Sequence, residues 1–440
     1  MKTRMNFKDE FYQKLKLLVL PIAIQNFMLA LVSATDAIML GWIDQTSLSA
    51  VSLAGQVQFV LSLFISGIAA GAGIMAAQYW GKRDAASIEK VIPIALRTNL
   101  LFSGLFTILA GFYPEMLMRI FTNDAALVAS GSQYLRAVAL SYVLCGISQV
   151  YLILLKNTGH AAVSSRISST AVVLNIILNA ILIYGLCGAP ALGIRGAAYA
   201  TVAARVVELI WAYLETKKPE RVRILWNRLF SSAGKILSED FWRYTLPVLA
   251  ASLVWGIAYV LYSVIMGHMG SDAVAANSIT SIAKSLLSCL IRGVSGGAGV
   301  LIGNLLGANE LEKAREYGGR LSHLSIAIGI VTGGLLMLIS PAIVHFAPLS
   351  DTAAEYLQYM LLFCGLNLMA QSVNTTVLDG IFCAGGDAKF DMQGNIGAMW
   401  CFSVPLGFLA AFWLKLPVMV VYCIVNLCLL YTSDAADDRI

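Results

Sequence analysis

The chain has 440 residues, of which 58% are hydrophobic and 12% charged, and its formal net charge is +5. An ordinary soluble domain carries about 25% charged residues, so this composition excludes a soluble domain and predicts an all-α polytopic membrane protein. The eight cysteines are scattered singly, without metal-ligand or disulfide spacing, and we interpret them as packing residues.

Apolar segments long enough to cross a bilayer alternate with short polar connections along the whole chain. They predict twelve transmembrane helices, over residues 15–41, 49–78, 91–113, 132–155, 166–187, 194–215, 243–268, 274–305, 320–346, 355–382, 391–414 and 417–431. The last helix has only about 13 apolar residues, which span roughly 20 Å of a hydrocarbon core about 30 Å thick. We therefore expect the chain after about residue 431 to be truncated or foreign.

Basic residues collect at the N-terminus and after the even-numbered helices. Only Arg119, Arg136, Arg195 and Lys415 lie in or beside the odd-numbered connections. The positive-inside rule then places both termini in the cytoplasm, and we expect a multi-pass protein of the bacterial inner membrane. This topology explains the basic charge more simply than nucleic-acid binding does.

The chain repeats itself. The segment Pro21–Gly41 returns 226 residues later as Pro247–Gly267, and Leu40–Asp84 shares 11 of 45 aligned positions with Met266–Glu310. Because an even number of predicted helices precedes the second copy, both copies have the same orientation, as parallel repeats do. We therefore predict an N-terminal six-helix lobe at 1–216, a cytoplasmic connecting segment at 217–242 and a C-terminal six-helix lobe at 243–440.

Asp36 is a carboxylate well inside the first apolar segment. An acid in a membrane helix is costly unless it faces a cavity or a partner, so Asp36 is a candidate functional residue. The repeated glycine-rich stretches, Ile65–Gly73 and Ile291–Gly299, have GxxxG spacing, which favours close helix packing over ligand binding. The chain has no Walker phosphate-binding motif, so we expect neither ATP nor another cofactor.

Taken as a set, several motifs give the chain a resemblance to the MATE (multidrug and toxic compound extrusion) family, over nearly its whole length. They are the pattern Pro21, Asp36, Gly41, the following Leu48–Val51, the two glycine-rich stretches, Asn175 and Asn179 in LNIILN, GAAYAT at Gly196–Thr201, and AGGDAKF at Ala384–Phe390. The resemblance implies a V-shaped two-lobe bundle that exports organic compounds by alternating access, driven by inward flow of H+ or Na+.

The resemblance also implies a cation site in the N-terminal lobe, formed by Asp36, Asn175, Asn179 and Thr201. Two features of the sequence support this grouping. Asn175 and Asn179 are four residues apart and share one helix face. Asp36, Asn179 and Thr201 all lie about 10 to 12 Å below the predicted outer surface. The alternative is that the two asparagines and Thr201 only join helices to one another.

Five further residues are candidates for the substrate cavity. Gln25 is a polar residue in the first helix. Tyr262 occupies the position in the second copy that corresponds to Asp36 in the first. Lys284 and Arg292 lie deep in the eighth helix, eight residues apart and on nearly one face. One interpretation is that these two basic residues bind Asp379 or backbone carbonyls. The other is that they line the substrate cavity. If they line it, the substrate should be anionic, zwitterionic or neutral.

Three functions are compatible with these features. The first is a secondary antiporter that exports small organic compounds, acting as a monomer in the lipid bilayer with H+ or Na+ as coupling ion. The second is a flippase of the same superfamily for lipid-linked oligosaccharides or other anionic lipids, which Lys284 and Arg292 favour. The third is a membrane-embedded enzyme, which the absence of DDxxD, HExxH and GxSxG motifs disfavours. We therefore expect a transporter and not an enzyme.

Overall fold

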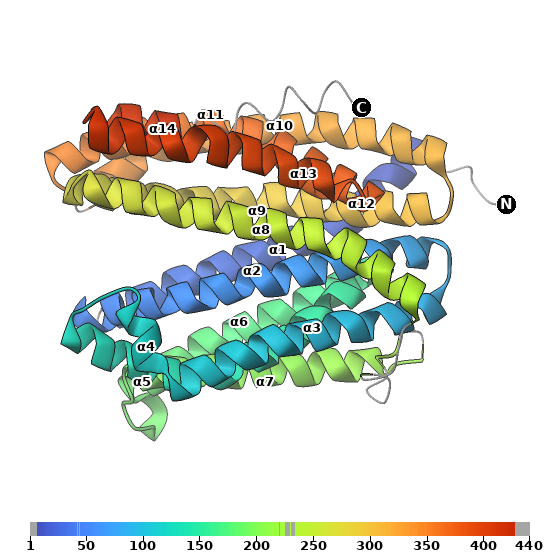
Figure 1. Ribbon diagram of the computed structural model, residues 1–440, viewed down its shortest axis with the longest axis horizontal. Coiled ribbons are helices and arrows are strands. Elements are labelled where there is room, and N and C mark those ends of the chain that lie inside the picture. The colour runs from blue at the N-terminus through green and yellow to red at the C-terminus, as the bar shows by residue number, and fades with distance from the viewer. Residues whose placement is uncertain are drawn as a thin grey trace. The chain divides into compact units, whose positions relative to one another are not determined.

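The computed structural model describes residues 7–426 except 42, 44, 220, 225–228, 230–233 and 348. Within this part the chain is helical and has no strand, which confirms the predicted all-α class (Figure 1). The long helices are α1 (Phe7–Gly41), α2 (Gln45–Gly81), α3 (Ala85–Phe112), α5 (Ala125–Leu155), α6 (Ala161–Tyr184), α7 (Ile194–Thr216), α8 (Lys235–His268), α9 (Ser271–Gly307), α10 (Leu311–Phe346) and α11 (Asp351–Asn374).

Shorter helices complete the described part of the chain. They are α4 (Pro114–Arg119), η1 (Lys156–His160), η2 (Leu186–Gly188), η4 (Thr375–Phe382), α12 (Cys383–Gly385), α13 (Ala388–Asn395), η5 (Ile396–Ser403), α14 (Val404–Phe408) and η6 (Leu409–Trp413). Residues 418–426 are also helical, and the rest of the predicted twelfth helix lies outside the described residues, as does the segment expected to be foreign.

Ten segments of the described chain are long and apolar enough to cross a membrane. One of them, Ala125–Tyr184, contains both α5 and α6, so these segments account for the first eleven predicted helices. Most helices begin several residues before the predicted start, because hydropathy marks only the apolar part of a helix and not its polar first turns. Asp84 shows how such a turn is stabilised, since it caps α3 by accepting the Ser87 backbone N–H at 3.0 Å. The hydrogen bonds from Ser87 lower the pKa of Asp84.

The chain divides into two compact units, and the division falls within helices. The first unit is Phe27–Leu249, and the second combines Met1–Asn26 with Ala250–Ile440. Pro21 in α1 and Pro247 in α8 lie close to the two points of division. A proline inside a helix removes one backbone hydrogen bond and weakens the helix locally. The predicted lobe boundary at 217–242 is a boundary between sequence repeats and stays a prediction.

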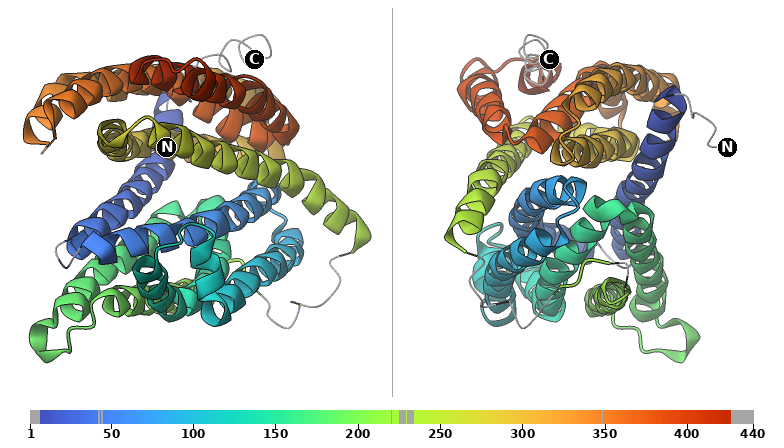
Figure 2. Two further views of the ribbon diagram at one scale, coloured as in Figure 1. Left: turned by 60° about the vertical axis from the view of Figure 1, so that its left-hand side comes forward. Right: turned by 90° about the vertical axis from the view of Figure 1, so that its right-hand side faces the viewer.

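In the first unit, α5 lies beside α2, α3 and α7 (Figure 2). The core between these helices is apolar and includes Leu61, Leu135, Val138, Tyr142 and Ala198. In the second unit, the start of α1 is part of the core, because Phe11 and Leu15 pack with Leu301, Tyr317 and Leu321.

The repeated glycines are the points at which two helices of each unit approach closely. A Cβ on Gly67 of α2 would lie 2.8 Å from the Cα of Leu249, and one on Gly293 of α9 would lie 3.0 Å from the Cα of Ala23. Gly67 and Gly293 are 226 residues apart, and so are Ala23 and Leu249.

Gly71 and Gly297, one helical turn further along, show the same close approach to the neighbouring helix. A Cβ on Gly71 would lie 2.7 Å from the Cα of Thr245 of α8, and one on Gly297 would lie 2.8 Å from Cγ2 of Val19 of α1. Each repeat therefore uses its glycines to hold the beginning of the other repeat's first helix, and the close-packing interpretation of these glycines is confirmed.

Gly71 provides a direct test of this packing. Gly71→Ala is expected to lower the free energy of unfolding by about 1–3 kcal/mol, because the added methyl group overlaps Thr245. The control is Gly104→Ala in α3, where a Cβ meets nothing within 4 Å and only the gain in helix propensity remains. Melting temperatures in detergent compare the two variants. Equal melting temperatures for both variants would contradict the close approach of α8 to α2.

Candidate functional site

The structure brings Asp36, Asn175, Asn179 and Thr201 together in the first unit. The Asn179 amide donates a hydrogen bond to Oδ1 of Asp36 at 2.6 Å and lies 3.3 Å from Oδ1 of Asn175. The Asn175 amide donates to the Thr201 hydroxyl at 3.3 Å. The four side chains thus form one chain of hydrogen bonds that runs from α1 through α6 to α7. Their predicted role in binding a cation stays a prediction.

Two contacts hold the three helices in the positions that this arrangement needs. The Tyr184 hydroxyl at the end of α6 donates to the Met39 carbonyl of α1 at 2.7 Å. Gly196 near the start of α7 lies against α6, where a Cβ would be 2.6 Å from the carbonyl carbon of Leu182. A larger residue at position 196 would push α7 away from α6 and separate Thr201 from Asn175.

The amide of Asn179 has an unused acceptor. Its Oδ1 is buried and has no hydrogen-bond partner among the described residues. A buried polar atom without a partner usually marks a place for water, an ion or a ligand. Rotating the amide by half a turn would exchange its oxygen and nitrogen and place Oδ1 beside the Asp36 carboxylate. Asp36, Asn179, Asn175 and Thr201 would then offer the oxygen atoms that a hard monovalent cation requires.

Asp36, Asn175 and Thr201 line a cavity of about 350 Å³, here called the Asp36 cavity. Side chains from α2, α5 and α7 complete its wall, among them Gln58, Phe59, Tyr134, Arg205 and Glu208.

Arg205 and Glu208 form an ion pair that our sequence analysis did not single out. The Arg205 guanidinium donates to both carboxylate oxygens of Glu208, at 3.0 and 2.9 Å, and the Ser148 hydroxyl donates to Oε1 at 2.6 Å. The Arg205 side chain is 20% exposed and that of Glu208 is 1% exposed. The signal in the sequence was two opposite charges three residues apart within one predicted membrane helix.

The charged side chains of the Asp36 cavity differ in whether an opposite charge lies beside them. Arg205 and Glu208 neutralise each other, whereas Asp36 has an amide partner and no cationic partner among the described residues. The cavity carries one uncompensated negative charge whenever Asp36 is ionised. Such a cavity attracts one positive charge and loses that attraction when Asp36 binds a proton or a cation.

The other five predicted residues lie in the second unit and do not line the Asp36 cavity. Tyr262 packs beside Ala258 and Ile265. Lys284 occupies the repeat position of Gln58, which lines the Asp36 cavity in the first unit. Gln25 is half-buried in α1.

Arg292 and Asp379 are charged neighbours, but no ion pair joins them in the described part of the chain. Asp379 lies in the π-helical segment η4 and also has Asp391 nearby. Asp391 accepts a hydrogen bond from the Asn395 amide at 2.9 Å. The predicted direct ion pair between Arg292 and Asp379 is therefore absent from the described part of the chain.

Comparisons with known proteins agree with the internal repeat. The MatE family model matches residues 21–181 and 247–409. The two matches begin 226 residues apart, which is the offset between the two copies in the sequence.

The chain is 21% identical over 426 residues to the probable multidrug resistance protein YoeA of Bacillus subtilis, covering 96% of this chain and 91% of YoeA. It is 24% identical over 393 residues to the probable multidrug resistance protein NorM of Agrobacterium fabrum, covering 86% of this chain and 84% of NorM. A solved structure of a MOP superfamily transporter from Pyrococcus furiosus has a TM-score of 0.87 at 19% identity, over 97% of this chain and 94% of that chain.

The ion pair in the wall of the Asp36 cavity makes a testable contribution to stability. Glu208→Gln is expected to lower the free energy of unfolding by about 3 kcal/mol, because it leaves the Arg205 guanidinium without its carboxylate partner and only partly hydrated. Thermal melting in detergent measures the loss. The double variant Arg205→Met with Glu208→Leu should recover most of it.

The matched control is Glu115→Gln, which removes a carboxylate from the exposed pair between Glu115 and Arg136. These two side chains are 61% and 59% exposed, so the expected change is below about 1 kcal/mol. Equal effects of Glu208→Gln and Glu115→Gln would show that the buried pair is not a structural element of the cavity.

Proposed function

This chain belongs to the MatE family, and from that premise we propose that it is a secondary active antiporter that exports small organic compounds. Its membership and its apolar helices make it a multi-pass membrane protein of a transporter family. In our proposal the exporter acts as a monomer in the cytoplasmic membrane, with both termini in the cytoplasm. Inward flow of H+ or Na+ supplies the energy, so that ATP is not needed.

The single observation that carries the proposal is the Asp36 cavity with its one uncompensated charge. Its volume of about 350 Å³ lies within the range of roughly 300–1,000 Å³ that is usual for small-molecule sites. The name of YoeA, a probable multidrug resistance protein, supports organic compounds as the exported class.

Coupling follows from competition for the charge of Asp36. When Asp36 is ionised, the cavity attracts a positively charged group of a substrate. When Asp36 holds H+ or Na+, that attraction is lost and the substrate is released. Because the two ligands weaken each other's binding by the same factor, a gradient of one can drive movement of the other. The amides of Asn175 and Asn179 and the Thr201 hydroxyl then assist the cation by presenting oxygen atoms to it.

The proposal predicts that Asp36→Asn abolishes coupled export while the protein still folds and inserts. The amide keeps the size of the side chain but cannot ionise, so the cavity no longer alternates between two charges. Transport in proteoliposomes with an imposed proton or sodium gradient tests this, with ethidium as a cationic substrate and carboxyfluorescein as an anionic one.

Asp351→Asn serves as the control, because it removes an exposed carboxylate at the start of α11, outside the Asp36 cavity. We expect this variant to transport as the wild type does. Gradient-driven transport at the wild-type rate in Asp36→Asn would remove Asp36 from the mechanism. The gradient that supports transport also identifies the coupling ion.

A further inference from the structure

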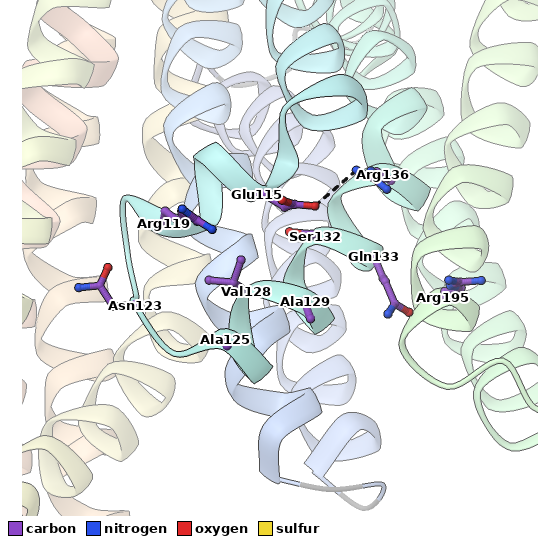
Figure 3. A pocket seen from close by; sticks show the side chains of 10 residues that line it. All are labelled: Glu115, Arg119, Asn123, Ala125, Val128, Ala129, Ser132, Gln133, Arg136 and Arg195. Atoms are coloured by element: carbon purple, nitrogen blue, oxygen red, sulfur yellow. Dashed lines mark ion pairs between the residues drawn. The ribbon is translucent and has the colours of Figure 1, made fainter.

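A second cavity lies in the first unit, at the end where α3 finishes and α5 begins. Its volume is about 740 Å³, and it shares no lining residue with the Asp36 cavity. Its wall includes Arg119 of α4, Arg136 of α5 and Arg195 of α7 (Figure 3). We call it the arginine pocket. These three residues are three of the four basic residues that lie in or beside the odd-numbered connections of the sequence.

The arginine pocket has an excess of positive charge. Glu115 lies 3.7 Å from Arg136, and both side chains are exposed. Arg119 and Arg195 have no ion-pair partner within the residues that the structure describes. Figure 3 shows Arg119 and Arg195 on opposite sides of Ser132. Folding therefore gathers arginines from three separate segments around one space, and among the described residues that line it Glu115 is the only carboxylate.

Ser132 provides a second and independent indication of a ligand. Its side chain lines the arginine pocket, is only 5% exposed, and its hydroxyl has no hydrogen-bond partner among the described residues. Buried hydroxyl groups are normally hydrogen-bonded, so this one is available to a molecule in the pocket. A hydroxyl donor between arginines suits an anion that accepts several hydrogen bonds, and a phosphate group does so.

The segment that carries Arg119 also exposes large apolar side chains. Phe112 is 77% exposed, and Tyr113, Met116, Ile120 and Phe121 are exposed as well. Aromatic and aliphatic side chains beside arginines are typical of the boundary between hydrocarbon and headgroups in a membrane. A ligand at this boundary would meet apolar side chains at one end and guanidinium groups at the other.

We propose that the arginine pocket binds the phosphate headgroup of an anionic phospholipid. Arg119 and Arg195 contact the phosphate oxygens, Ser132 donates a hydrogen bond to one of them, and the acyl chains lie against the exposed side chains of 112–121. Arginine is well suited to this contact because its planar guanidinium donates two parallel hydrogen bonds to phosphate. Basic pockets between membrane helices on the matrix or cytoplasmic side bind anionic lipid headgroups. The arginine pocket offers the same contacts on the side of the odd-numbered connections.

The test is native mass spectrometry of the full-length protein in detergent with phosphatidylglycerol or phosphatidylcholine of the same acyl chains. We expect the wild type to retain phosphatidylglycerol preferentially. The double variant Arg119→Gln with Arg195→Gln should bind it about thirtyfold more weakly, because two guanidinium contacts to the headgroup are lost and each contributes on the order of 1 kcal/mol. The matched control, Arg166→Gln with Lys415→Gln, removes two positive charges elsewhere and should leave binding unchanged.

A third arm adds inorganic phosphate in excess, and the proposal expects phosphatidylglycerol to stay bound. Displacement of the lipid by inorganic phosphate would overturn the lipid as the ligand and point to a free phosphate. Equal retention of the two lipids by the wild type, or unchanged binding in the double variant, would overturn the pocket itself. If the double variant does not fold, each single variant is measured instead against the same control. Since binding is measured and not transport, the outcome is independent of the role of Asp36.

Discussion

The hydrogen bond from the Asn179 amide to the Asp36 carboxylate is the interaction on which the candidate site depends. A charge inside a membrane helix is costly unless the protein provides polar partners or a cavity. Asp36 receives both, since the amide lies 2.6 Å away and the Asp36 cavity opens beside it. The close approach of α7 to α6 at Gly196 and the hydrogen bond from Tyr184 to Met39 are the structural conditions for this arrangement.

The two repeats share their packing but differ in their charges. Gly67 packs against Leu249 as Gly293 packs against Ala23, so the helix packing is the same in both repeats. The polar positions are not duplicated, because Asp36 corresponds to Tyr262 and Gln58 corresponds to Lys284. Two repeats with the same fold but different charges can differ in function, so that one repeat binds the cation and the other does not. This asymmetry agrees with the proposal that a single carboxylate in the first unit couples transport.

Much of this structure could be predicted from the sequence, because a bilayer allows few alternatives for an apolar segment. The helices follow from hydropathy, and the parallel repeat follows from the offset between the two copies of the sequence. The grouping of Asp36 with Asn179 and Thr201 came from the resemblance to the MATE family, and their similar predicted depth supported it. The helix starts were predicted too late, because their first turns are polar. Arg205 and Glu208 were overlooked because a pair of opposite charges one turn apart resembles a common helix-stabilising pair. The arginine pocket combines residues from three separate segments, and no local pattern indicates that they meet.

Release of the coupling ion by a substrate tests the central claim most directly, because antiport through Asp36 requires the two ligands to oppose each other. A compound that the wild type transports is added to the purified protein in weakly buffered detergent, while a pH indicator and a sodium electrode follow the solution. The account predicts that binding releases H+ or Na+ from the wild type and releases neither from Asp36→Asn. Binding to the wild type without release of either ion would contradict it.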